Sequence, residues 1–144
     1  MSENKYRVLL VDDSKDDRFF MRMALERSPK FVLMREARDG QEVLDYLGGE
    51  GAFNDRKTYP IPDIVLLDLK MPRKNGYDVL QWLKTQTFKN LAVVVVSDSA
   101  LPGDVAQSTA LGAVGHFRKT SVKGEYEAML GKVVELIEKR CCAA

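Results

Sequence analysis

The sequence has few of the features that mark secreted, membrane or nucleic-acid-binding proteins. It contains only two cysteines, the adjacent Cys141 and Cys142, so a disulfide framework and a zinc site are excluded and we expect a reduced, unstructured tail. No apolar run is long enough to span a bilayer, and the polar start has no secretory segment. The net charge of +1, from 22 basic and 21 acidic residues, indicates neither nucleic acid nor an anionic membrane as a partner. We therefore expect a cytoplasmic protein.

The composition is that of one folded domain. Apolar residues make up 45% of the 144 residues and charged residues 30%, so the chain can bury a core without covalent links. We expect a single domain over 1–144, with a short polar lead at 1–4 and a C-terminal tail at 140–144. One irregular stretch, 48–62, has three glycines and two prolines. Loops of this length are uncommon, and we expect either a flexible insertion or a partner contact.

Short apolar runs alternate with helical patterns along the chain. The runs are predicted to be strands at 7–11, 31–34, 64–67, 91–96 and 113–117. Amphipathic patterns around 19–25, 43–47, 77–83 and 126–137 predict helices, with Ser14 as the N-cap of the first. Five successive strand–helix units predict a doubly wound α/β fold. Its five-stranded parallel sheet is expected in the order 2-1-3-4-5, with helices on both faces.

Polar residues follow the buried strands directly. Asp12 and Asp13 follow the first strand, Asp68 the third, Ser97 the fourth and Lys119 the fifth. The carboxyl ends of parallel strands meet at one edge of the sheet, and the expected order places the first strand beside the third. We therefore expect three carboxylates, a hydroxyl and an ammonium group in one pocket.

This combination suits phosphoryl chemistry. Clustered carboxylates repel one another unless a cation lies among them, and Mg²⁺ takes such oxygen ligands while still accepting phosphate oxygens. A carboxylate such as Asp68 can act as the nucleophile towards a phosphoryl group. Lys119 and the Ser97 hydroxyl would then stabilise the phosphoryl oxygens.

Each residue alone also has an ordinary structural explanation. Asp12 and Asp13 would favour the N-terminus of the first helix through its dipole. Asp68 would be a loop acid and Ser97 an N-cap, while Lys119 would be a solvated surface residue. The functional interpretation rests on all five residues lying at the same edge.

These motifs together resemble the receiver domain of bacterial two-component response regulators. The matching segments cover nearly the whole chain and are Val8–Ser14, Leu66–Pro72 with Asn75-Gly76, Val95–Ser97 and Phe117–Lys119. The resemblance implies the flavodoxin-like fold, and it implies that a sensor histidine kinase phosphorylates Asp68. It further implies that Asp12, Asp13 and Asp68 hold Mg²⁺ together with the backbone carbonyl of Lys70.

The resemblance also implies a conformational switch. Ser97 and Lys119 would bind the phosphoryl oxygens, and Ser97 would act with His116 to change the surface of the fourth helix, fifth strand and fifth helix. Output would pass through another protein, a homodimer formed by that surface, or a phosphorelay. The 48–62 insertion and the Lys119-Thr120 pair are similar to single-domain regulators that partner bacterial phytochrome kinases, so a bacteriophytochrome is the expected kinase.

Three residues depart from the usual receiver pattern. Thr120 replaces the proline that commonly follows the lysine, so we expect a trans bond with a rearranged loop or a strained cis bond. Asp98 replaces a small residue after Ser97 and is expected to slow phosphorylation by small donors. His116 replaces a Tyr or Phe; it is either a half-exposed strand residue or a switch that moves inward.

Three other functions compete with this interpretation. An aspartyl-phosphate phosphohydrolase would carry Asp two residues after Asp68, where this chain has Lys70. A flavin-binding module would carry a phosphate loop where Asp12 and Asp13 stand. A degenerate receiver would bind partners without phosphorylation, but the acidic cluster of this chain is intact, which counts against that alternative.

Overall fold

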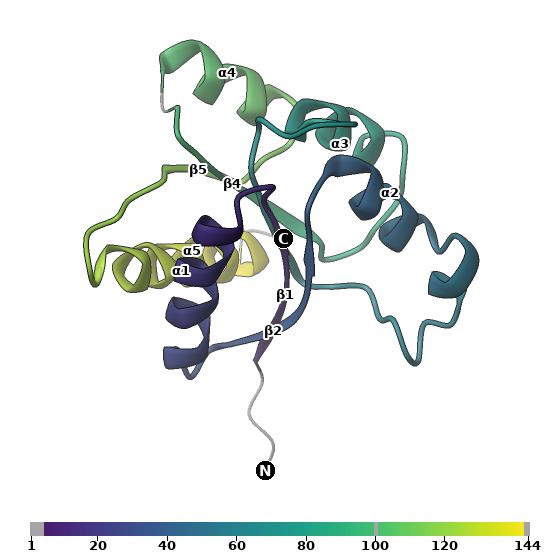
Figure 1. Cartoon of the computed structure of the whole chain (residues 1–144), viewed down its shortest axis with the longest axis horizontal. Coiled ribbons are helices and arrows are strands. Elements are labelled where there is room, and N and C mark those ends of the chain that lie inside the picture. Colours follow the sequence, from purple (N-terminus) through teal and green to yellow (C-terminus); the bar gives the residue numbers. More distant parts are fainter. Residues whose placement is uncertain (1–4, 100, 143–144) are drawn as a thin grey trace.

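The computed structural model describes residues 5–99 and 101–142 as an alternating series of strands and helices (Figure 1). The strands are β1 (Tyr6–Val11), β2 (Phe31–Ala37), β3 (Ile64–Leu67), β4 (Ala92–Ser97) and β5 (Gly115–Arg118). The α-helices are α1 (Lys15–Arg27), α2 (Gly40–Gly48), α3 (Gly76–Leu83), α4 (Pro102–Ala110) and α5 (Glu125–Cys142), and a short 3₁₀ helix, η1, covers Gly51–Asn54. All four strand pairings are parallel, and the sheet order is β2-β1-β3-β4-β5, which confirms the predicted fold.

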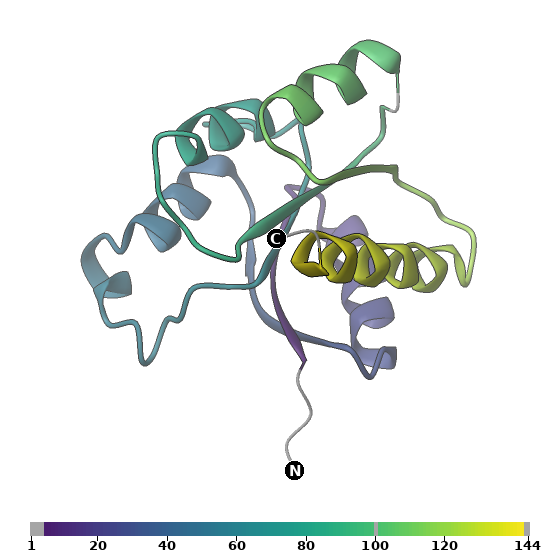
Figure 2. The same ribbon diagram turned by 180° about the vertical axis from the view of Figure 1, so that it is seen from behind.

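The sheet is buried on both faces by helices. α1 and α5 cover one face, whereas α2, α3 and α4 cover the other, as the two opposite views show (Figures 1 and 2). Side chains of β1 alternate between the two cores, with Val8 and Leu10 in the first and Leu9 and Val11 in the second. Every residue of β3 and β4 is buried, which explains why these strands appear in the sequence as continuous apolar runs.

Three helices begin with side-chain caps at the edge of the sheet where the strands end. The N–H of Asp17 donates to Ser14 Oγ at the start of α1, as predicted. Asp39 caps α2 in the same way, and Asn75 forms a reciprocal capping box with Asp78 at the start of α3. These caps fix the loops between strand and helix, which are the segments that carry the polar site.

The segment predicted as a flexible loop, 48–62, contains η1 and packs against the domain. Rings of Tyr46, Phe53 and Tyr59 contact one another with centroids 5.1–6.2 Å apart, and the Arg35 guanidinium lies over all three. Arg56 donates to the carbonyl oxygens of Tyr46 and Tyr59. The sequence reasoning did not foresee this packing, because it depends on rings and cations from three separate elements. A partner contact by the segment stays a prediction.

The predicted termini differ in how far the structure describes them. The polar lead at 1–4 and the last two residues lie outside the described part of the chain. The expected unstructured tail from residue 140 is wrong for 140–142, where the backbone continues α5 to Cys142. Neither proline nor glycine follows Gly131 to end this helix. Within residues 5–99 and 101–142, no helix combines the length and apolar character needed to span a bilayer.

Candidate functional site

The ends of β1 and β3 bring three carboxylates together. The N–H of Asp68 donates to the carbonyl oxygen of Val11 at 3.0 Å, which places the end of β3 beside the end of β1. One oxygen from each of Asp12, Asp13 and Asp68 lies within 4.8 Å of the others. Asp12 and Asp68 are buried, whereas Asp13 is exposed. The predicted acidic cluster is therefore present, and its one exposed member leaves a side open to solvent.

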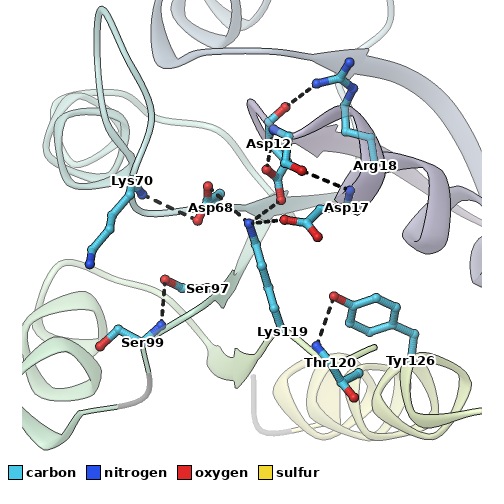
Figure 3. A network of polar contacts seen from close by, with 11 residues as sticks. Asp12, Asp17, Arg18, Asp68, Lys70, Ser97, Ser99, Lys119, Thr120 and Tyr126 are labelled. Carbon is cyan, nitrogen blue, oxygen red and sulfur yellow. Dashed lines mark hydrogen bonds and ion pairs between the residues drawn. The ribbon is translucent and has the colours of Figure 1, made fainter. Parts of the chain in front are cut away.

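Lys119 brings its ammonium group into this cluster from the end of β5. Its Nζ lies 2.9 Å from Asp12 Oδ2 and 3.4 Å from Asp68 Oδ2 (Figure 3). A third carboxylate, Asp17 on α1, lies 2.8 Å from the same nitrogen. The Lys119 side chain is only 8% exposed, so it is a buried counter-ion and not the solvated residue that its type alone would suggest.

Burial and pairing shift the pKa values in this pocket. Burial raises the pKa of Asp68 to about 6, against the opposing attraction of Lys119, and the neighbouring Asp12 raises it further. Burial also raises the pKa of Asp12, although its hydrogen bond with Lys119 acts in the opposite direction. Burial alone would lower the pKa of Lys119, but hydrogen bonds to Asp12 and Asp17 raise it above its ordinary value. The pocket therefore holds more negative charge than its one ammonium group compensates.

The donor set fits a hard divalent cation. Carboxylate oxygens that converge within this distance match the ligands that Mg²⁺ and Mn²⁺ prefer. The side-chain ammonium of Lys70 points away from the cluster, whereas its N–H lies 3.4 Å from Asp68 Oδ1 (Figure 3). Metal ligation by the Lys70 carbonyl stays a prediction.

Ser97 is fully buried at the end of β4, next to the cluster in the sheet. The Lys119 N–H donates to the Ser97 carbonyl oxygen at 2.8 Å, so the two predicted phosphoryl-binding residues are joined through their backbones. The Ser97 hydroxyl accepts a 3.3 Å hydrogen bond from the N–H of Ser99. Figure 3 shows this hydroxyl apart from the contacts between Asp68 and Lys119.

His116 is half-buried on β5 and bridges two parts of the α4 region. Its Nε2 lies 2.8 Å from the carbonyl oxygen of Ser99, which can only accept, so Nε2 carries the proton. Its Nδ1 lies 2.9 Å from Ser108 Oγ on α4. Ser99 Oγ in turn donates to Asp104, which also accepts a 2.6 Å hydrogen bond from the Tyr77 hydroxyl. The loop between β4 and α4 is thus tied to both β5 and α3.

The other two unusual residues, Asp98 and Thr120, directly follow Ser97 and Lys119 in the chain. The Lys119–Thr120 peptide bond is trans, not the strained cis form that the sequence also allowed. The N–H of Thr120, which a proline would lack, lies 3.3 Å from the Tyr126 hydroxyl (Figure 3). Asp98 is exposed, directly after Ser97. Its effect on phosphorylation stays a prediction.

Gly76 allows α3 to approach the backbone that directly follows β3. Its N–H donates to the Leu69 carbonyl oxygen at 2.9 Å. A Cβ at this position would lie 2.4 Å from the carbonyl oxygen of Asp68 and 2.7 Å from the Leu69 Cα. The Asn75-Gly76 pair therefore does more than begin a helix, because it sets the position of the loop that carries Asp68.

Sequence reasoning missed Asp17 and the polar network around Asp104. Asp17 stands in the first helical turn, where an acid is explained by the helix dipole, and only the return of Lys119 from 102 residues away reveals its partner. Tyr77 belongs to a segment whose pattern indicates only an amphipathic helix, and the segment that holds Ser108 gives almost no pattern. No spacing in the sequence connects them to His116.

Comparisons with known proteins agree with this geometry. The profile of the family described as "Response regulator receiver domain" matches residues 8–130. A protein-glutamate methylesterase/protein-glutamine glutaminase of Myxococcus xanthus is 32% identical over 139 residues, which cover 96% of this chain but only 36% of that protein. The chain thus spans about a third of the length of that curated relative.

Two solved structures are similar over most of their length. The phosphorylated cyanobacterial phytochrome response regulator RcpA is 30% identical, with a TM-score of 0.79 over 91% of this chain and 92% of that one. The Mn²⁺-bound form of response regulator Rcp1 is 29% identical, with a TM-score of 0.75 over 89% and 91% of the two chains. From its matched profile, sheet order and acidic pocket, the chain belongs to the receiver-domain family of response regulators.

Proposed function

We propose that this chain accepts a phosphoryl group on Asp68 from a sensor histidine kinase and signals by changing shape. The observation that carries the proposal is the convergence of three carboxylates and one buried lysine at the ends of adjacent strands. Asp12, Asp13 and Asp68 would hold Mg²⁺, which supplies positive charge to the pocket and to phosphoryl oxygens. The likeness to a regulator solved in an Mn²⁺-bound form supports a divalent cation as a ligand of this chain.

The transfer step requires Asp68 as an ionised nucleophile. One of its carboxylate oxygens attacks phosphorus, the bond from phosphorus to the donor histidine nitrogen breaks, and the donor leaves as a neutral imidazole after taking up a proton. Lys119 favours the ionised form of Asp68 and stands ready to pair with the phosphoryl oxygens. Burial of Asp68 keeps most water away from the acceptor, which limits its reaction with water.

A direct test is incubation with Mg²⁺ and acetyl phosphate, followed by intact mass measurement. The wild type should gain the mass of one phosphoryl group, and Asp68→Asn should not. Asp16→Asn, an exposed change of the same kind on α1, serves as the matched control and should still be labelled. An unlabelled wild type, or a labelled Asp68→Asn, would contradict the assignment.

A groove beside the pocket suits the docking of a protein donor. It has a volume of about 290 Å³ and is bounded by α1 and by the loop that follows Lys119. Phe19 and Phe20 line it while being 47% and 51% exposed, and Val122 is 59% exposed on the loop side. α1 begins shortly after Asp12 and Asp13, and the loop directly follows Lys119, so the groove adjoins the acceptor site. We therefore propose that the kinase segment carrying the phosphohistidine docks here.

The docking proposal separates protein donors from small donors. Phe19→Ala combined with Phe20→Ala should slow transfer from a kinase at least about tenfold, as expected for the loss of two aromatic anchors. The same variant should keep its rate with acetyl phosphate. Val32→Ala is the matched control, since Val32 is 43% exposed on β2 outside the groove. An unchanged rate of phosphoryl transfer from the kinase would exclude the groove as its docking site. The likeness to RcpA makes a bacterial phytochrome the first kinase to test.

For output we propose that Ser97 and His116 act as the switch. If the Ser97 hydroxyl turns to a phosphoryl oxygen, it gives up its bond with Ser99, whose carbonyl oxygen holds the His116 ring. The α4, β5 and α5 surface would then change, with a second copy or another protein as its reader. Beryllofluoride should shift the ring signals of the single histidine in NMR spectra. If the reader is a second copy of the chain, beryllofluoride should also lower the elution volume of the protein in size-exclusion chromatography. Unshifted ring signals would count against the switch. We also propose a cytoplasmic location, as expected from the composition.

A further inference from the structure

The contact between Lys119 and Asp17 has no part in the chemistry described above. Asp17 Oδ2 lies 2.8 Å from Lys119 Nζ, nearer than the carboxylate oxygens of Asp12 and Asp68. Asp17 belongs to the first turn of α1, and its side chain is 33% exposed. It is absent from the group of carboxylates that converge on the candidate cation site. Asp17 is therefore a partner for the lysine that does not compete for the cation.

The local sequence predicts a different position for the Asp17 side chain. Asp17 stands three residues after the N-cap Ser14, which is the spacing of a capping box, in which its carboxylate would accept from the Ser14 N–H. That N–H donates instead to Asp12 Oδ1 at 2.9 Å. The Asp17 carboxylate therefore does not cap the helix and instead accepts a hydrogen bond from Lys119 (Figure 3).

The geometry creates a conflict that Asp17 resolves. Without Asp17, the closest carboxylate partners of the buried ammonium group would be Oδ2 of Asp12 and Oδ2 of Asp68, and both residues belong to the cation cluster. A divalent cation and the ammonium group would then compete for the same residues. With Asp17 present, Lys119 keeps one charged partner when a cation takes the others, so it remains buried, charged and within reach of the acceptor.

We propose that Asp17 is a positioning residue for Lys119, holding its ammonium group at the side of the pocket so that Mg²⁺ can bind. The inference rests on the proposed function, because it presumes a divalent cation among Asp12, Asp13 and Asp68. It adds a residue to the site that acts through the lysine and touches neither the cation nor the phosphoryl group.

The test is the Mg²⁺ affinity of the metal-free protein, measured by titration calorimetry at physiological salt. Asp17→Asn should weaken binding about two- to fivefold, the size expected for one partly exposed ion pair. Asp17→Glu should restore most of the loss. Asp16→Asn removes the same charge from the same helical turn and should change affinity by less than about 1.5-fold, since Asp16 is exposed and screened.

A double-mutant cycle separates positioning from simple loss of negative charge. In a Lys119→Gln background there is no ammonium group to relocate, so Asp17→Asn should have a clearly smaller effect than in the wild type. Equal effects in both backgrounds, or an unchanged affinity of Asp17→Asn, would overturn the inference while leaving the cation site in place. A wild-type chain that binds no Mg²⁺ would overturn the proposed function and this inference with it.

Discussion

The buried carboxylate of Asp68 should destabilise the metal-free fold at neutral pH. Its pKa rises from an ordinary 3.8 to about 6 in the folded chain, chiefly because burial penalises the charged form. The folded state therefore holds its proton more tightly than the unfolded state does between these two values. As pH rises through this interval, the free energy of unfolding falls, and above about pH 6 the full cost is present.

The size of the effect follows from the shift. About two pKa units correspond to roughly 3 kcal/mol between the two protonation states, and this value already includes the opposing attraction of Lys119. Asp68→Asn keeps the shape of the side chain and removes its charge. We therefore expect the variant to be more stable than the wild type by about 1–3 kcal/mol at pH 7.5 in EDTA. The gain should shrink as pH falls from 6 and vanish near pH 4.

Urea unfolding followed by the fluorescence of the single tryptophan, Trp82, measures this difference at each pH. Asp98→Asn, a neighbouring but exposed carboxylate, is the matched control and should change stability by less than about 0.5 kcal/mol at every pH. Mg²⁺ at a hundred times its dissociation constant should stabilise the wild type by about 2.7 kcal/mol and the Asp68→Asn variant by less. A variant no more stable than the wild type at pH 7.5, or a gain that persists at pH 4, would refute the reasoning.

Further changes probe the surroundings of Asp68 and the packing of the 48–62 segment. Asp98→Ala should accelerate labelling by acetyl phosphate, because it removes an exposed negative charge beside the pocket; equal rates would refute this. Gly76→Ala should lower the free energy of unfolding by about 1–3 kcal/mol and slow labelling, since its Cβ would lie 2.4 Å from the Asp68 carbonyl oxygen; wild-type melting and labelling would contradict it. Tyr46→Phe removes a 2.7 Å hydrogen bond to the Pro60 carbonyl oxygen and should cost about 1 kcal/mol in urea unfolding, with an unchanged midpoint as the contrary result.

The elements that are buried on both faces were the ones most visible in the sequence. β3 and β4 appear as uninterrupted apolar runs, and the predicted 64–67 coincides with β3. β2 extends to Ala37, three residues past its predicted end, because Arg35 and Glu36 are strand residues whose polar ends find partners on other elements. α4 gives almost no pattern, since Ser108 is its only buried residue among those the structure describes.

The same contrast holds for the site. Asp12, Asp13, Asp68 and Lys119 follow strands directly, so the topology alone brings them to one edge. The role of Asp17 depends on a competition between two carboxylates for one N–H group, which no spacing rule anticipates. Phe19 and Phe20 are exposed for a related reason: helix periodicity shows that apolar residues share a face, but the packing of α5 decides how much of that face is covered.

The order of charges along the chain has a consequence for folding. Among the described residues, the carboxylates that contact Lys119 are all made by residue 68, whereas the lysine directly follows β5, the last strand of the sheet to be synthesised. The N-terminal half must therefore bring β1 and β3 together while its acids repel one another without their internal cation. The contact between Asp17 and Lys119 joins residues 102 positions apart in the sequence, and contacts this far apart form slowly during folding. Divalent cations should accordingly accelerate the pairing of these strands during synthesis, before Lys119 has been made.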